Sequence, residues 1–268
     1  MIAHDGVLSE DVLERVKKGV LRKLGVACSS VTTSQIDAVK EVLQHEPCAL
    51  LELDLSDCKV DEKPCFDGMT LPQVLLPPTE RLACWRLRSL QLSGCGLTGD
   101  LATTTELLLE CRMLNELRLG QNSLTGSIPG WLFAKLHLRV LYLLGNELSG
   151  AIPPEVGLCT TLVELWLANN KLSGAIPPEM GRCSALRTLM LWGNQLSGEI
   201  PPELGQCTSL QEQLDLQKNQ LSGSIPRELG KLIALKQLSL WAKTSCAAPY
   251  PMSLAIAPPW STSICTKI

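Results

Sequence analysis

The chain has 268 residues, of which 45% are apolar, so it can bury a sizeable core in one large domain or two small ones. Its net charge is −3 and no run of basic residues exceeds two, which argues against a nucleic-acid-binding protein. It has no stretch of 18 apolar residues, so no membrane span is predicted, and its charged N-terminus does not resemble a secretory signal. The sequence as written predicts a cytoplasmic protein. The alternative, if the gene model is incomplete, is an extracellular or plasma-membrane protein.

Two helices are predicted at the start of the chain. Ser9 to Leu24 begins with acidic residues, ends with basic ones and is followed by Gly25, which is typical of a helix that stops there. Ser34 to Gln44 is a second, shorter helix with Ile36, Val39 and Leu43 on one face. We interpret residues 1–47 as a helical N-terminal cap, with a separate partner-binding helix pair as the alternative.

A glycine-rich stretch follows, and it poses a choice between two functions. Gly94, Gly96 and Gly99 in "LSGCGLTGD" match G-x-G-x-x-G between an apolar run and a possible helix at 101–113, the order of a dinucleotide-binding turn. However, Gly99 is also in register with glycines of the downstream repeat. We therefore interpret it as a repeat glycine and predict no cofactor.

The repeat itself is the strongest pattern in the sequence. Segments such as "LVELWLANNKLSGAIPPEM" recur, and their asparagines fall at positions 122, 146, 170, 194 and 219, at spacings of 24, 24, 24 and 25. The same frame extends upstream, with Cys95 and then Cys58 in the asparagine position. The longer last step predicts a bulge in which Leu210 is displaced and Gln211 takes the place of the first leucine.

This pattern resembles the plant-type leucine-rich repeat of receptor-like kinase ectodomains, although no kinase signature follows it. The resemblance implies an α/β solenoid, a right-handed superhelix with a parallel sheet on its concave face. We expect an irregular first repeat at 48–86, the solenoid at 87–243 and a poorly ordered tail at 244–268.

The residues of one coil fit this architecture. Leu117 and Leu119 alternate as in a strand, so both point to a buried face. The asparagine that follows can satisfy buried backbone groups in the bend, so stacked copies predict an asparagine ladder. In the family the "LSG-x-IP" segment is a second, shorter strand, and "PPELG" reads as a short helical turn with proline at its start.

Cysteine positions divide into two groups. Cys111, Cys159, Cys183 and Cys207 keep the repeat register, which predicts small buried core positions. Those four lie three residues before the first leucine of a repeat, whereas Cys58 and Cys65 do not occupy that position; these two and Cys84 could form disulfides in an oxidising compartment.

Catalytic chemistry is not indicated, whereas a binding surface is. No metal-binding or nucleophile motif occurs, so we predict no catalytic and no metal-ligand residues. Residues between and flanking the strand leucines should face outward on the concave side, and four of the ten aromatic residues, including Trp241, fall there. The predicted partner is a protein or peptide, and the predicted partner-binding residues are Arg118, Tyr142, Leu144, Trp166, Met190, Trp192 and Asp215. The sequence is compatible with three functions: a binding module, a fragment of a receptor-like ectodomain and, least favoured, an enzyme that uses the glycine loop.

Overall fold

The computed structural model describes residues 10–18, 22–25, 30–44, 50–60, 62–75 and 86–240. The chain divides into two compact units, residues 1–126 and 127–268, which are described separately. Cys84, Trp241 and the predicted tail at 244–268 lie outside the described residues.

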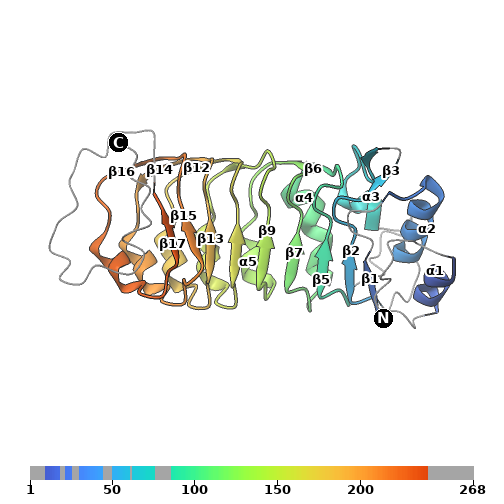
Figure 1. Cartoon of the computed structure of the whole chain (residues 1–268), viewed down its shortest axis with the longest axis horizontal. Coiled ribbons are helices and arrows are strands. Elements are labelled where there is room, and N and C mark those ends of the chain that lie inside the picture. The colour runs from blue at the N-terminus through green and yellow to red at the C-terminus, as the bar shows by residue number, and fades with distance from the viewer. Residues whose placement is uncertain are drawn as a thin grey trace. The chain divides into compact units, whose positions relative to one another are not determined.

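The first unit contains a parallel sheet, a hairpin and short helices (Figure 1). The sheet runs through β1 (Lys23–Gly25), β2 (Glu52–Asp54), β5 (Ser89–Gln91) and β7 (Glu116–Arg118). A second parallel pair joins β6 (Thr98–Asp100) to β8 (Ser123–Thr125), and β3 (Lys59–Val60) forms an antiparallel hairpin with β4 (Lys63–Pro64). The helices are α1 (Glu10–Lys17), α2 (Thr33–Gln44), α3 (Leu71–Leu75), α4 (Leu101–Thr105) and the 3-10 helix η1 (Glu106–Glu110).

The predicted helix at Ser9 to Leu24 is correct only in its first half. Helix α1 ends at Lys17, and Leu24 lies in β1, where it is buried and paired with Leu53 of β2. Strand pairing and burial of Leu24 outweigh the local helical pattern, which is a weak determinant beside tertiary contacts. Helix α2 agrees with the prediction, and its three apolar residues are buried. The role of α1 and α2 as a cap remains a prediction.

The glycines of the G-x-G-x-x-G stretch are positions of close approach between coils. Gly96 has a φ of +78°, and a Cβ atom there would lie 2.8 Å from Cα of Asp67, in the turn after β4. Gly99 also has a positive φ, as does its repeat equivalent Gly126. Chain packing therefore accounts for these glycines, as the repeat interpretation predicts.

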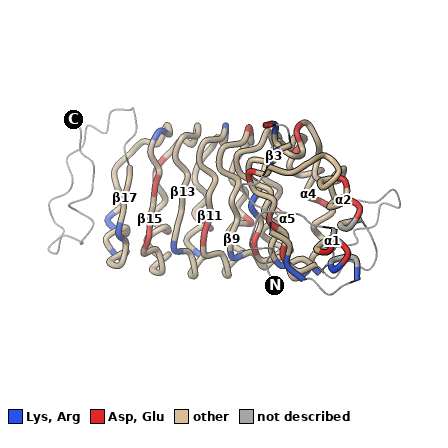
Figure 2. The backbone as a smooth tube through the Cα atoms, turned by 45° about the vertical axis from the view of Figure 1, so that its right-hand side comes forward, with Lys and Arg blue, Asp and Glu red and all other residues tan. Residues whose placement is uncertain are grey.

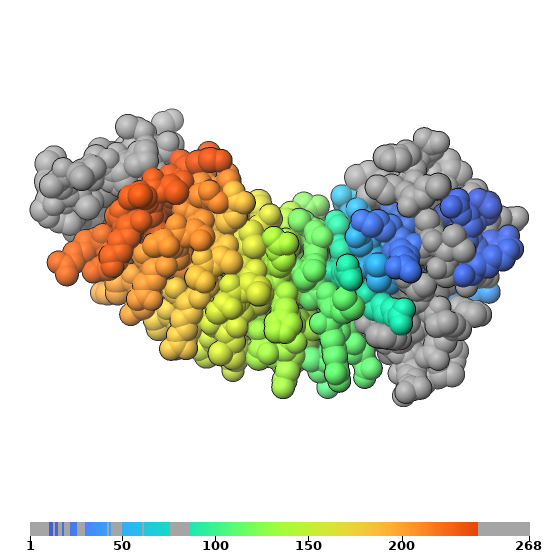
Figure 3. All heavy atoms as spheres, turned by 90° about the horizontal axis from the view of Figure 1, so that it is seen from below, coloured from blue at the N-terminus to red at the C-terminus, as the bar shows by residue number. Residues whose placement is uncertain are grey.

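The second unit is a stack of regular coils. Its larger sheet is parallel and follows chain order (Figure 1) through β9 (Val140–Tyr142), β11 (Glu164–Trp166), β13 (Thr188–Met190), β15 (Gln213–Asp215) and β17 (Gln237–Ser239). A smaller parallel sheet contains β10 (Ser149–Gly150), β12 (Lys171–Gly174), β14 (Gln195–Glu199) and β16 (Gln220–Ser222). Each coil also has a short helix: α5 (Trp131–Lys135), η2 (Pro154–Leu158), η3 (Pro178–Arg182), η4 (Pro202–Gln206) and η5 (Arg227–Lys231). In the space-filling view the coils of this unit appear as successive bands of colour, each against the next (Figure 3).

The core of the second unit is a column of leucines in register. Leu141, Leu165 and Leu189 are direct neighbours on β9, β11 and β13, and all three are fully buried. On the helical side the backbones approach closely, because a Cβ atom at Gly181 would lie 2.3 Å from the carbonyl oxygen of Glu203 in the next coil. A single coil could not bury its own leucines, so the stack creates the core.

The asparagine ladder is confirmed. The side chain of Asn170 donates from Nδ2 to the carbonyl oxygens of Leu143 (3.0 Å), Leu167 (3.1 Å) and Ala168 (3.2 Å). Its Oδ1 accepts a hydrogen bond from the backbone N–H of Leu148 at 3.0 Å. Each carboxamide thus joins its own coil to the preceding one, and similar bonds are made by Asn122, Asn194 and Asn219.

Cysteine stands in for asparagine in the first unit. Cys95 is fully buried and its Sγ donates to the carbonyl oxygen of Leu55, in the preceding coil, at 3.1 Å. Asn122 makes the corresponding bond to the carbonyl oxygen of Leu92 at 2.9 Å. The thiol therefore replaces one of the donor functions of the carboxamide.

The in-register cysteines are buried, as predicted. Burial raises the pKa of the Cys183 thiol to about 12 and that of Cys207 to about 11. Cys183 donates to the carbonyl oxygen of Val156 at 3.3 Å, and Cys207 donates to that of Met180 at 3.2 Å. These side chains are thiols that link neighbouring coils as well as fill the core.

The predicted position of the bulge is wrong in detail. Leu210 is fully buried, and its N–H bonds to the carbonyl oxygen of Cys207, as the N–H of Leu186 does to that of Cys183. Gln211 is partly exposed and does not replace the leucine. The extra residue is accommodated between Leu210 and β15, because keeping the leucine in the core costs less than burying a glutamine amide.

Deletion of Glu212 is expected to leave the melting temperature within about 2 °C of wild type or to raise it. The deletion would restore the 24-residue spacing, and Gln211 could take over the backbone bond from the N–H of Glu212 to the carbonyl oxygen of Arg187. The ion pairs of Glu212 with Arg187 and Lys236 are exposed and should contribute little. Thermal unfolding followed by circular dichroism tests this, and a large drop would show that the extra residue is required.

Candidate binding surface

The outward side of the larger sheet in the second unit carries the aromatic residues. We call this side the strand face, defined by the residues of β9, β11, β13, β15 and β17 that flank the buried strand leucines. Tyr142 and Trp166 are lateral neighbours on it, with ring centroids 5.4 Å apart and planes inclined by 41°. The indole Nε1 of Trp166 donates to Oε2 of Glu164 at 3.1 Å. Both rings are partly exposed, so this aromatic pair is available for contact.

The structure corrects the expected exposure of two predicted binding residues. Met190 is 5% exposed and Asp215 is 7% exposed, and the two are neighbours on β13 and β15. Burial raises the pKa of the Asp215 carboxyl group, whose oxygens accept hydrogen bonds from the backbone N–H and the side chain of Gln217. Met190 and Asp215 therefore expose little surface that a partner could contact.

Trp192 and Leu144 lie just after the strands and are partly exposed. The ammonium group of Lys218 lies 5.6 Å from the ring centroid of Trp192, a cation–π contact. Arg118 belongs to the first unit, where it pairs with Glu116 at 2.6 Å. Six of the seven predicted residues thus belong to one unit, and four of those six are partly exposed.

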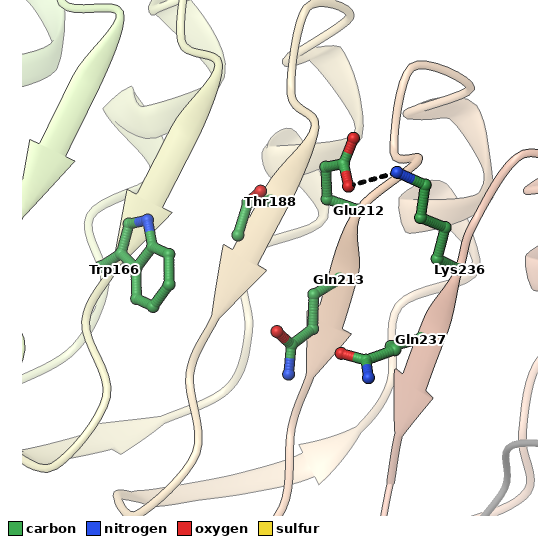
Figure 4. A pocket seen from close by; sticks show the side chains of 6 residues that line it. All are labelled: Trp166, Thr188, Glu212, Gln213, Lys236 and Gln237. Carbon is green, nitrogen blue, oxygen red and sulfur yellow. Dashed lines mark hydrogen bonds and ion pairs between the residues drawn. The ribbon is translucent and has the colours of Figure 1, made fainter.

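A cavity of about 450 Å³ opens on the strand face beside Trp166. Figure 4 shows side chains from successive strands around it, with Trp166 at one side and Lys236 and Gln237 at the other. Lys236 and Glu212 form an ion pair at 2.7 Å, and this hydrogen bond lowers the pKa of the Glu212 carboxyl group. The lining residues are Trp166, Thr188, Glu212, Gln213, Lys236 and Gln237.

Sequence reasoning identified only Trp166 among these lining residues. The seven predicted binding residues all lie between or just after the strand leucines, whereas Thr188, Gln213 and Gln237 immediately precede a leucine. A residue on either side of a buried strand residue points to the same outward face. Including the preceding positions would have found these three.

The strand face combines an aromatic pair with neutral polar groups. Glutamine amides and a threonine hydroxyl can each donate and accept hydrogen bonds. Figure 2 shows charged positions scattered singly along the backbone of this unit.

Among the described residues, no group of three or more His, Cys, Asp or Glu side chains could hold a metal ion. No helix within the described ranges is long and apolar enough to span a membrane.

Comparison with known proteins agrees with this architecture. The model of the family described as Leucine Rich Repeat matches residues 137–159, 161–183, 185–207 and 212–232. These four segments of the chain are leucine-rich repeats. No curated protein sequence matches it.

Solved leucine-rich repeat structures resemble most of the chain. The ectodomain of the receptor kinase GASSHO1/SCHENGEN3 from Arabidopsis thaliana, in complex with CASPARIAN STRIP INTEGRITY FACTOR 2, is 30% identical with a TM-score of 0.66 over 85% of this chain. The plant peptide hormone receptor RGFR1 in complex with RGF2 is 30% identical with a TM-score of 0.62 over 83%. The Arabidopsis receptor kinase HAESA with an extended IDA peptide hormone is 28% identical with a TM-score of 0.58 over 83%. The aligned part covers only 28%, 38% and 38% of those chains, respectively.

Proposed function

We propose that this leucine-rich repeat protein is a non-catalytic module that binds a peptide on the strand face of its second unit. The cavity beside the Tyr142–Trp166 pair is the observation that carries the proposal. Its volume lies in the range of about 300–1,000 Å³ that is typical of ligand sites.

The chemistry of the face suits a peptide. An aromatic pair offers apolar area for a side chain and is rigid, so little conformational entropy is lost on binding. Gln213 and Gln237 are more exposed than Thr188, and their amides can pair with the alternating N–H and C=O groups of an extended backbone. The peptide hormone receptor RGFR1 and the receptor kinase HAESA, whose structure contains a peptide hormone ligand, share this fold. A role as part of a receptor-like ectodomain is the more specific form of the same proposal.

Selection from a displayed library of random 12-residue peptides tests the proposal. The full chain would be immobilised, enriched peptides synthesised, and their affinity measured by calorimetry. Hydrogen–deuterium exchange should then show protection in β11, β13, β15 and β17 when a selected peptide is added. Protection confined to the helical side of the coils, around η2 to η5, would contradict the proposed surface, as would a failure to enrich any peptide.

A further inference from the structure

The coil that has one residue more than its neighbours brings an acidic residue to the cavity on the strand face. It carries both Gln211 and Glu212 between its buried leucine and β15, where the other described coils of this unit have one residue. Those single residues are Arg139, Val163, Arg187 and Lys236. The N–H of Glu212 donates to the carbonyl oxygen of Arg187, and its own carbonyl oxygen accepts from the N–H of Gln237, so Glu212 lies in the same row. Within these described coils, Glu212 is the acidic member of a row that is otherwise basic, neutral or apolar.

The Glu212 carboxylate lies between two cations from the neighbouring coils. Its Oε1 is 3.3 Å from Nη2 of Arg187, and its Oε2 is 2.7 Å from Nζ of Lys236 (Figure 4 shows the second contact). The hydrogen bond from Lys236, together with the charges of Lys236 and Arg187, lowers the pKa of the Glu212 carboxyl group. The carboxylate therefore occupies the position that an anionic group of a ligand would take between the same two cations.

Stability does not account for this arrangement. The side chains of Arg187, Glu212 and Lys236 are 47%, 41% and 67% exposed, and ion pairs between exposed groups add little to the free energy of unfolding. The other coils reach the same parallel strand pairing with one residue fewer. Glu212 and Lys236 both line the cavity, and charges at a binding surface mainly decide which partners are accepted. The acidic residue is therefore better explained by what the cavity accepts.

We propose that Glu212 excludes anionic groups from the cavity beside Trp166, so that the bound peptide places an uncharged residue there. The identity of the ligand as a peptide rests on the proposed function, whereas the charge balance at Glu212 stands without it. An acidic side chain would meet the Glu212 carboxylate in the place between Arg187 and Lys236, where like charges repel. A basic side chain would gain little, because that carboxylate is already paired with both cations. An uncharged side chain avoids both costs and can pack its apolar part against Trp166.

Glu212→Gln removes the charge and keeps the shape of the side chain. Arg187 would still be held, since the amide of Gln211, with its oxygen toward the guanidinium group, accepts a hydrogen bond from Nη2 at 2.7 Å. The variant therefore leaves two cations on either side of a neutral residue. Glu147→Gln is the matched control, because Glu147 also forms an exposed ion pair, with Lys171 at 2.9 Å, but lies between β9 and β10, outside the strand face.

Titration with sodium sulfate tests the charge balance without a peptide. The amide signals of Gln213 and Gln237 in the isotope-labelled full chain would be followed by NMR at constant, low ionic strength, where such charges are weakly screened. We expect Glu212→Gln to bind sulfate at these amides about fivefold more tightly than wild type or Glu147→Gln. The gain should vanish when Lys236→Gln is added to Glu212→Gln. Equal sulfate affinity of wild type and Glu212→Gln would overturn the proposal.

The peptides selected in the test of the proposed function extend this experiment to the ligand. Each residue of a selected peptide would be replaced in turn by Glu and by its neutral isostere Gln, and the affinities measured by calorimetry. At the position that enters the cavity, the Glu peptide should bind wild type about fivefold more weakly than the Gln peptide, and this difference should disappear in Glu212→Gln. Glu and Gln peptides that bind wild type equally at every position, or selected peptides rich in acidic or basic residues, would contradict the proposal. If no peptide is enriched, the proposed function fails, while the sulfate titration still decides whether Glu212 excludes anions.

Discussion

Asn170→Ala is expected to lower the free energy of unfolding by about 1–3 kcal/mol, because it leaves a buried backbone N–H without its partner. The alanine would remove the acceptor for the N–H of Leu148, in the preceding coil, and would leave the carbonyl oxygen of Leu143 with the bond from Asn146 but without the one from Asn170. Equilibrium unfolding in urea, followed by circular dichroism, measures the change. Since the carboxamide joins two coils, the loss should also increase hydrogen exchange at Leu148.

Gln195→Ala is the matched control for this prediction. Gln195 comes directly after the next ladder residue, Asn194, but its side chain is exposed and the strand β14 that contains it pairs through the backbone. The variant should unfold within about 0.5 kcal/mol of wild type, as exposed substitutions usually do. Equal destabilisation by Asn170→Ala and Gln195→Ala would contradict the assignment of the ladder to stability.

Trp166→Ala is expected to weaken binding of a selected peptide by at least about 2 kcal/mol, or roughly 30-fold in Kd. Trp166 contacts Tyr142 on one side and lines the cavity on the other, so it is central to the proposed surface. Calorimetric titration of wild type and variant with the same peptide gives the comparison. Folding should be little affected, since the ring lies outside the leucine core and is partly exposed.

The control for Trp166→Ala lies on the helical side of the same unit. Glu179 is in the first turn of η3, and its backbone carbonyl oxygen and Cβ pack against Gly157 of the preceding coil, so Glu179→Ala keeps both. This variant should bind the peptide with the affinity of wild type. If Trp166→Ala keeps that affinity and instead lowers the melting temperature, the aromatic pair is structural and the proposed surface is wrong.

The regular part of this protein can be predicted from its repeat spacing. The 24-residue spacing defined the buried leucines and the asparagine ladder, because each coil contacts the neighbouring coils at a fixed separation along the chain. A pattern that repeats at that separation is therefore also a map of contacts. The same reasoning identified Gly99 as a repeat position, and its positive φ is shared by its repeat equivalent Gly126.

Features that depend on packing between particular side chains could not be predicted from the spacing. Leu24 became a strand residue because β2 was available to pair with it, which no local pattern around it indicates. Met190 lies in a position that faces outward, yet neighbouring side chains bury it. The place of the extra residue after Leu210 and the cavity beside Trp166 likewise depend on how the side chains and backbones of adjacent coils fit together. Spacing specifies which positions face outward, but the sizes of lateral neighbours decide which of those positions reach solvent.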